Sequence, residues 1–220
     1  MMHKRIKLRT VVVSASFLLL GWAALSLTYC CRSGELSTVI AAQNYFRKWR
    51  TYYSTDLKFS VQFPDGSAPK PMQKGIDHHG EKVVAKGFVA QDSDRVWGVL
   101  VLEKFIPKLK AKLTTQTQLN SLLDSYIDGA IKNAESQAGA KLRIREVVAL
   151  GKYPGRHVEV GFSNGFVSEM NVYLVEGAIY QLEYGYSPAG PGPSTALDGD
   201  LFFKSFRVGQ GIPIGATQLK

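Results

Sequence analysis

Hydrophobic and polar residues alternate along several short stretches of the chain from Tyr52 onward. In the first stretch the apolar positions are Leu57, Phe59, Val61 and Phe63, and the polar residues between them are Lys58, Ser60 and Gln62. Alternation with period two is typical of a strand that turns one face to a core and the other to solvent. Pro64-Asp65-Gly66 ends this strand, because proline has no N–H for the ladder and Asp-Gly accepts turn dihedrals.

Further strands are predicted before and after a long helical stretch. Before it, Lys82 to Gln91 and Arg95 to Phe105 form a predicted hairpin. After it, four strands are expected at Lys141 to Leu150, Gly155 to Ser163, Gly165 to Val175 and Ala178 to Ser187. Turn sequences such as Asn164-Gly165 and Glu176-Gly177 separate them, and Asn-Gly between apolar runs favours a hairpin. The pattern therefore predicts an antiparallel meander.

A helix is predicted between Thr117 and Ala138. Its apolar positions follow the spacing of three, four and seven residues: Leu119, Leu122, Leu123, Tyr126, Ile127, Ala130, Ile131 and Ala134. Such a stripe indicates packing against a core. Thr115 or Thr117 can cap the first turn, and Gly139 can adopt the left-handed conformation that ends a helix.

A second, shorter helix is expected from Ser194 to Phe206, after the loop Ala189 to Pro193. Its inward residues are predicted to be Leu197, Leu201, Phe202 and Phe206. Asp198 and Asp200 are interpreted as helix N-terminal residues that complement the dipole. Strands, a long helix, more strands and a final helix indicate the α+β class, with an antiparallel sheet covered by one long and one short helix.

The N-terminal segment has the pattern of a membrane helix. Met1 to Arg9 is basic, and Val11 to Tyr29 then contains no charged residue. This length is close to the roughly 20 residues that span a bilayer. The basic residues before it predict a cytoplasmic N-terminus, with the domain on the other side of the membrane. The residues expected in the bilayer include Val11, Val12, Phe17, Leu18, Leu19, Leu20, Trp22, Leu25 and Leu27.

Three outcomes are compatible with this segment: a retained anchor, a cleaved signal, or a lipoprotein. Retention is favoured, because a cleaved signal has a shorter apolar core followed by small residues. Lipidation at Cys30 or Cys31 is the third outcome, with Leu27-Thr28-Tyr29-Cys30 resembling a lipoprotein signal except for bulky Tyr29. Residues 1–31 are thus an anchor or signal, and residues 32–50 a predicted stalk or connecting helix.

The formal net charge of +9 gives no sign of nucleic-acid binding. Lys4, Arg5, Lys7, Arg9 and Arg32 flank the apolar run, so 22 of the 27 basic residues remain against all 18 acidic residues, a balance of +4. One basic cluster stands out, formed by Lys104, Lys108, Lys110 and Lys112. It is interpreted either as a solvated loop or as a contact for anionic lipid or an acidic partner.

No catalytic constellation or cofactor motif is visible in the sequence. It has no G-x-S-x-G elbow and no uninterrupted phosphate-binding glycine loop. Asp77, His78, His79 and Glu81 are the best metal candidates, since imidazole and carboxylate suit Zn or Cu. Adjacent side chains on an extended segment point opposite ways, which favours a solvated turn instead. His157 is interpreted as a structural residue of a strand.

Four short motifs lie on the predicted elements: Phe59 to Pro64 (FSVQFP), Gly151 to Arg156 (GKYPGR), Val172 to Tyr184 (VYLVEGAIYQLEY) and Phe202 to Arg207 (FFKSFR). Together with the order of the elements, they resemble the PsbP-like fold. The group includes the photosystem subunit PsbP, a Ran-binding import factor and bacterial envelope proteins of unassigned role. The resemblance covers the domain at residues 51–208 and implies a binding or assembly role. The tail at 209–220, which contains glycine and proline, is expected to be flexible.

The expected function is therefore that of a membrane-anchored, non-enzymatic domain that binds a protein partner in the envelope. A secreted or lipidated binding protein is the first alternative. A metal-binding protein or metal-dependent enzyme that uses Asp77, His78, His79 and Glu81 is the second.

Overall fold

The computed structural model describes residues 48–78, 81–92, 94–103, 115–187, 194–209 and 215–219. In chain order its elements are β1 (Trp49–Ser54), β2 (Phe59–Pro64), β3 (Lys70–His78), β4 (Glu81–Gln91), β5 (Arg95–Leu102), α3 (Gln116–Ala138), β6 (Lys141–Leu150), β7 (Tyr153–Gly161), β8 (Val167–Val175), β9 (Ala178–Tyr186), α4 (Ser194–Ser205), β10 (Arg207–Val208) and β11 (Thr217–Gln218).

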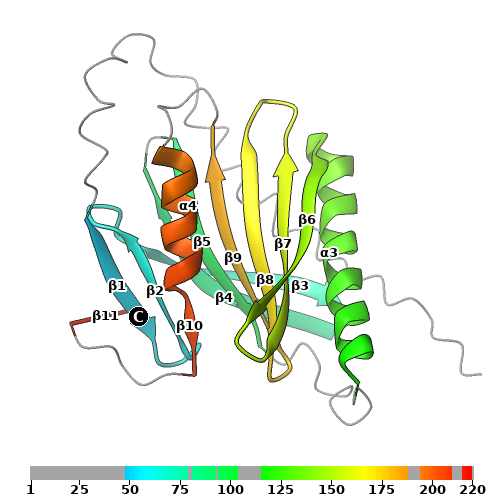
Figure 1. The fold of residues 1–220 in the computed structure, drawn as a ribbon, viewed down its shortest axis with the longest axis horizontal. Coiled ribbons are helices and arrows are strands. Elements are labelled where there is room, and N and C mark those ends of the chain that lie inside the picture. The colour runs from blue at the N-terminus through cyan, green and yellow to red at the C-terminus, as the bar shows by residue number, and fades with distance from the viewer. Residues whose placement is uncertain are drawn as a thin grey trace, which may run out of the picture.

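The centre of the domain is a seven-stranded sheet in the order β3-β4-β5-β9-β8-β7-β6, in which all neighbours are antiparallel. A smaller four-stranded sheet has the order β10-β2-β1-β11. Helix α3 lies on one side of the large sheet, and α4 lies on the other side with β1 and β2 (Figure 1). The predicted α+β class and the antiparallel sheet with two covering helices are confirmed.

Helix α3 and one face of the large sheet enclose the first core. Leu123, Tyr126 and Ala134 of the helix are at most 1% exposed, and they meet residues such as Leu100 and Val172 of the strands. Each fully buried side chain of the size of Leu123 contributes roughly 2 kcal/mol to stability. Thr115 forms a capping box with Gln118, and Gly139 ends the helix with φ of 60°. The stripe and both ends of the helix agree with the prediction from sequence.

The opposite face of the large sheet, the small sheet and α4 enclose a second core that is rich in aromatic rings. Phe63 of β2 meets Phe202 of α4 with ring centroids 5.6 Å apart, and Phe206 stacks on Tyr173 of β8 at 6.2 Å. Aromatic pairs at such separations add roughly 1 kcal/mol beyond the area they bury. The second core therefore ties the small sheet and α4 to the large sheet.

Three elements differ from the sequence-based expectations. Strand β1 begins at Trp49, so the domain starts inside the residues 32–50 that were expected to form a stalk. Strand β3 was not predicted, and it makes a sheet edge that pairs with β4 along its whole length. Strand β11 pairs in parallel with β1, and Leu219 is only 8% exposed. The prediction of a flexible tail at 209–220 is thus wrong for its end, because apolar burial fixes Leu219.

The orientation of α4 also differs from the prediction. Phe202 and Phe206 are fully buried as expected, but Leu197 and Leu201 are 55% and 46% exposed. Asp198 lies on the buried face instead, where Arg95 donates a hydrogen bond to its carboxylate. Asp200 pairs with Lys204 at 2.6 Å on the exposed face. These two carboxylates therefore form ion pairs in the body of the helix, and they do not serve its N-terminus.

The predicted membrane segment and the rest of residues 1–47 lie outside the described residues. Among the helices that the structure does describe, none combines the length and apolar character of a membrane span.

A polar group lies inside the first core. Glu183 of β9 is 2% exposed and accepts a hydrogen bond of 2.7 Å from the hydroxyl of Ser168. Its Oε2 atom has no hydrogen-bond partner among the described residues. Nearby, the hydroxyl of Tyr126 donates to Gln181 at 3.0 Å. Burial raises the pKa of Glu183 to about 8, although hydrogen bonds from Ser168 and Gln181 act in the other direction.

This buried carboxyl predicts a loss of stability as the pH rises. Between its ordinary pKa of 4.5 and the folded value of about 8, the unfolded chain releases the proton while the folded domain retains it. Stability should therefore fall through this window and stay low above it. We expect Glu183→Gln to remove this dependence and to raise the free energy of unfolding at pH 7 by at most about 3 kcal/mol. Urea unfolding at pH 5 and pH 8 measures the effect.

The exposed Glu135 of α3 offers the matched control. Glu135→Gln should leave the pH dependence as in the unmodified chain. An equal pH dependence in Glu183→Gln and the unmodified chain would contradict a neutral, buried Glu183.

Candidate binding cleft

The structure describes only part of the residues that the sequence proposed as sites. Asp77, His78 and Glu81 lie at the tip of the β3–β4 hairpin, where the register pairs His78 with Glu81 and Asp77 with Lys82. Their side chains, and all of His79, lie outside the described part of the structure. Among the described side chains, no group of three or more His, Cys, Asp or Glu residues could hold a metal ion. The proposed metal ligands are not among these side chains, so the metal hypothesis stays a prediction.

The other proposed contact residues lie outside the described ranges as well. These are the membrane residues from Val11 to Leu27, Cys30 and Cys31, and the basic cluster Lys104, Lys108, Lys110 and Lys112. Their roles stay predictions.

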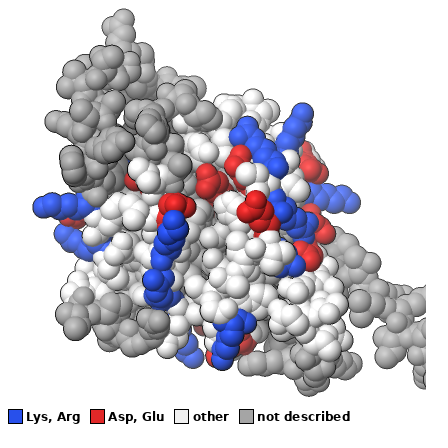
Figure 2. Space-filling view, viewed as in Figure 1, with Lys and Arg blue, Asp and Glu red and all other residues white. Residues whose placement is uncertain are grey.

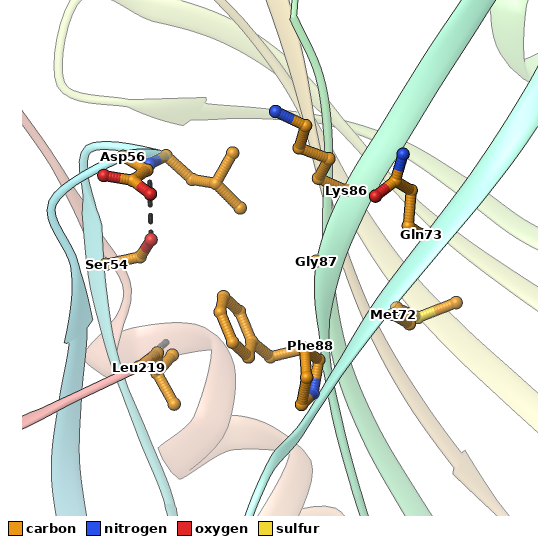
Figure 3. A pocket seen from close by; sticks show the side chains of 10 residues that line it. Ser54, Asp56, Met72, Gln73, Lys86, Gly87, Phe88 and Leu219 are labelled. Carbon is orange, nitrogen blue, oxygen red and sulfur yellow. Dashed lines mark hydrogen bonds between the residues drawn. The ribbon is translucent and has the colours of Figure 1, made fainter.

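A cleft that the sequence did not reveal lies between the small sheet and the β3–β4 hairpin (Figure 3). Its volume is about 240 Å³. The end of β1 and the turn after it contribute Ser54, Asp56 and Leu57. The other lining residues are Pro71, Met72 and Gln73 of β3, Lys86, Gly87 and Phe88 of β4, and Leu219 near the end of the chain.

The floor of the cleft is apolar and fixed by packing. Leu57, Phe88 and Leu219 are at most 8% exposed, and all three belong to the second core. The ring of Phe88 lies 6.3 Å from that of Phe59 in an edge-to-face arrangement. At Gly87 an added Cβ would meet the carbonyl oxygen of Val99 at 1.9 Å, so only glycine lets β4 approach β5 this closely. The floor is therefore rigid.

The rim of the cleft carries opposite charges. Asp56 is exposed on the turn, and Lys86 reaches from β4 on the other wall (Figure 3). The Nζ atom of Lys86 also lies 3.6 Å from a carboxylate oxygen of Glu103, and half of the Lys86 side chain is exposed. Gln73 is opposite Lys86 in the β3–β4 register and is exposed as well. The rim can thus offer an anion, a cation and an amide to a bound group.

The chemistry of the lining points to binding. Ser54 has the only hydroxyl among the described lining residues, and its oxygen accepts a hydrogen bond of 3.2 Å from the backbone N–H of Leu57. Besides Ser54, the polar side chains among the described lining residues are Asp56, Gln73 and Lys86. The lining thus combines an apolar floor with polar and charged groups at the rim, a combination that suits recognition.

His157, which the sequence suggested to be structural, has two partners on the α4 side of the sheet. Its Nδ1 lies 2.8 Å from the side-chain oxygen of Asn171, and its ring meets Phe203 of α4 edge-on at 6.2 Å. These contacts hold α4 to β7 and support the structural interpretation.

An ion network joins α3 to the sheet. Arg156 donates to Asp124 at 2.9 and 3.0 Å, and Arg145 donates to the same carboxylate at 2.7 Å. Partial burial alone would raise the pKa of Asp124, but the two arginines outweigh it and hold this pKa below its ordinary value.

On the face shown in Figure 2, basic and acidic side chains are intermixed, and no broad area of one sign appears.

The wall at Leu219 makes a testable prediction. The backbone N–H of Leu219 donates to the carbonyl of Tyr53 at 2.8 Å, and the side chain is buried. Leu219→Ala should lower the free energy of unfolding by about 2 kcal/mol, because it removes a buried side chain. Urea unfolding checks this, with Gln218→Ala as the control, since Gln218 is exposed. Equal stability of the two variants would show that Leu219 does not pack in the floor of the cleft.

No family model matches the chain, and neither does any curated protein. Among solved structures, it is similar to cyanobacterial PsbP (CyanoP) from Synechocystis sp. PCC 6803, at 17% identity and a TM-score of 0.45, over 80% of this chain and 98% of that chain. It is also similar to PA94, a protein of unknown function from Pseudomonas aeruginosa, at 12% identity and a TM-score of 0.33, over 64% of this chain and 84% of that chain. The first of these structures is a PsbP protein, which belongs to the group that the sequence motifs resemble.

Proposed function

We propose that the chain is a non-enzymatic binding domain that recognises a protein partner through the cleft between β1, β3 and β4. The N-terminal segment anchors the domain to a membrane, and the domain acts on the non-cytoplasmic side, within the cell envelope. The observation that carries this proposal is the rigid apolar floor of the cleft beneath a rim of opposite charges.

The size of the cleft favours a side chain of a protein over a free small molecule. Pockets for drug-sized ligands usually measure about 300–1,000 Å³. The cleft, at about 240 Å³, is smaller and has an open mouth. Protein interfaces concentrate their binding energy in one or a few bulky side chains that enter a preformed apolar pocket. An aromatic or large aliphatic residue of a partner fits this description.

The charged residues of the rim can orient such an anchor residue. Asp56 and Lys86 lie on opposite walls, so a partner with a basic residue on one side of its anchor and an acidic residue on the other would pair with both. Charged residues at a rim mainly set the association rate and the choice of partner, while the buried anchor supplies affinity. The partner is therefore a protein surface with an apolar residue between opposite charges.

The anchoring part of the proposal depends on the sequence. Val11 to Tyr29 is uncharged and long enough to cross a bilayer, and basic residues precede it. The domain begins at Trp49, so residues 30–48 connect the segment to β1. A cleaved signal or a lipid on Cys30 or Cys31 would give the same domain another attachment, and mass spectrometry of the mature N-terminus separates the three forms.

Site-specific photocrosslinking tests the binding proposal. A benzoylphenylalanine at position 73 places the probe on the exposed rim, and the full chain is irradiated in its native membranes. We expect a discrete crosslinked protein. Lys86→Glu should reduce its yield at least fivefold by reversing the charge of one wall, and Asp56→Ala tests the opposite wall independently.

Matched controls come from α3, on the other side of the large sheet. A probe at the exposed Lys132 should give no such product, and Lys132→Glu should leave the yield at position 73 unchanged. Equal labelling from positions 73 and 132, or a yield insensitive to both rim variants, would refute recognition through the cleft. Unchanged thermal midpoints of the variants would show that folding is intact.

A further inference from the structure

Strand β6 forms the edge of the large sheet farthest from the cleft. The strand order places β3 at one edge and β6 at the other. Among the described residues, β6 pairs only with β7, so the backbone groups on its outer side have no ladder partner. Open edges of this kind pair readily with another strand.

The two edges of the sheet are protected differently. Strand β3 contains Pro71, Gly75 and the lysines Lys70 and Lys74, which are features that discourage pairing at an edge. The first half of β6 is protected too, by a register shift between Leu142 and Ile144 and by the charge of Arg143. The second half, Glu146 to Leu150, has an uninterrupted register with β7 and contains no proline, glycine or lysine.

Apolar residues of β6 are exposed along this edge. Val147 is 78% exposed, and Leu142 and Ile144 are 41% and 38% exposed. Val148 and Leu150 are half-buried, because they pack at the margin of the second core. Arg145 is turned toward α3, where it lies 2.7 Å from Asp124 and 2.5 Å from Asp128. Its charge is therefore neutralised within the chain and does not repel a strand at this edge.

We propose that β6 pairs with β6 of a second copy of this chain, antiparallel and centred on Val147, so that the two large sheets join edge to edge. A twofold axis perpendicular to the sheet keeps each face continuous and brings the same surface of both copies together.

The sequence of β6 is complementary to itself in this register. Val147 faces Val147 of the second copy, and Ile144 faces Leu150 on the opposite face of the sheet. Arg145 faces the small Ala149, and Glu146 faces Val148, so no like charges are directly opposed. A register centred on Arg145 or on Glu146 would oppose two like charges, which destabilises a cross-strand pair. Charge and size therefore select the register centred on Val147 over these two.

The pairing is compatible with partner recognition at the cleft, because β3 and β6 are opposite edges of one sheet. Its test is also separate from the crosslinking at position 73, so either proposal can fail without the other.

Cysteine crosslinking tests the register directly. In the full chain with Cys30→Ser and Cys31→Ser, Val147→Cys should give a disulfide-linked dimer under mild oxidation, because the residue lies opposite itself near the axis. Val84→Cys is the matched control, since Val84 is an exposed valine whose backbone already pairs with Gly75 of β3. It should give at least tenfold less dimer.

Light scattering or mass photometry of the full chain measures the association without crosslinking. We expect a dimer that Val147→Lys dissociates, with at least a tenfold higher dissociation constant, while Val84→Lys leaves it unchanged. A monomer at all concentrations, a Val147→Cys yield equal to the control, or a β6 edge occupied only by another protein would each overturn the proposal.

Discussion

Burial of the large sheet on both faces is the constraint on which the rest of this structure depends. Every residue of β5 is buried, with Leu100 and Leu102 in the first core and Trp97, Val99 and Val101 in the second. A sheet of this kind is stable only if something covers each face, because exposed apolar faces on both sides would favour aggregation. Helix α3 covers one face, and the other needs the small sheet and α4 together.

The way in which the two faces of the large sheet are covered determines where the cleft lies. The small sheet approaches the β3–β4 hairpin over the second core, and the cleft forms where the turn after β1, β4 and the chain end meet. Its floor is part of the same core, so the cleft is as rigid as the fold that supports it. The open edge at β6 is the other end of the same sheet, where β6 pairs only with β7 among the described residues.

The parts of the fold that could be predicted from sequence are those with local signals. Helix α3 follows from its apolar spacing with Thr115 and Gly139 at its ends, and the strands β6 to β9 follow from alternation and turn residues. Strand β3 was missed because its sequence, KPMQKGIDH, has few residues that favour strands. Hydrogen bonding to β4 makes this segment a strand in spite of its low strand propensity. The inward face of α4 was misassigned because Asp198 is buried by an ion pair with Arg95, which hydropathy cannot indicate. The cleft was invisible in the sequence, since Leu57, Met72, Phe88 and Leu219 meet only after folding.

In our proposal, a protein partner occupies the cleft while the chain is in its membrane. Carbene footprinting tests it most directly, by comparing the full chain in native membranes with the purified chain in vesicles of the same lipids. The account predicts that labelling of Leu57, Met72 and Phe88 is lower in native membranes, while labelling of the exposed face of α3 is the same in both. Equal labelling of the cleft in the two samples would contradict it.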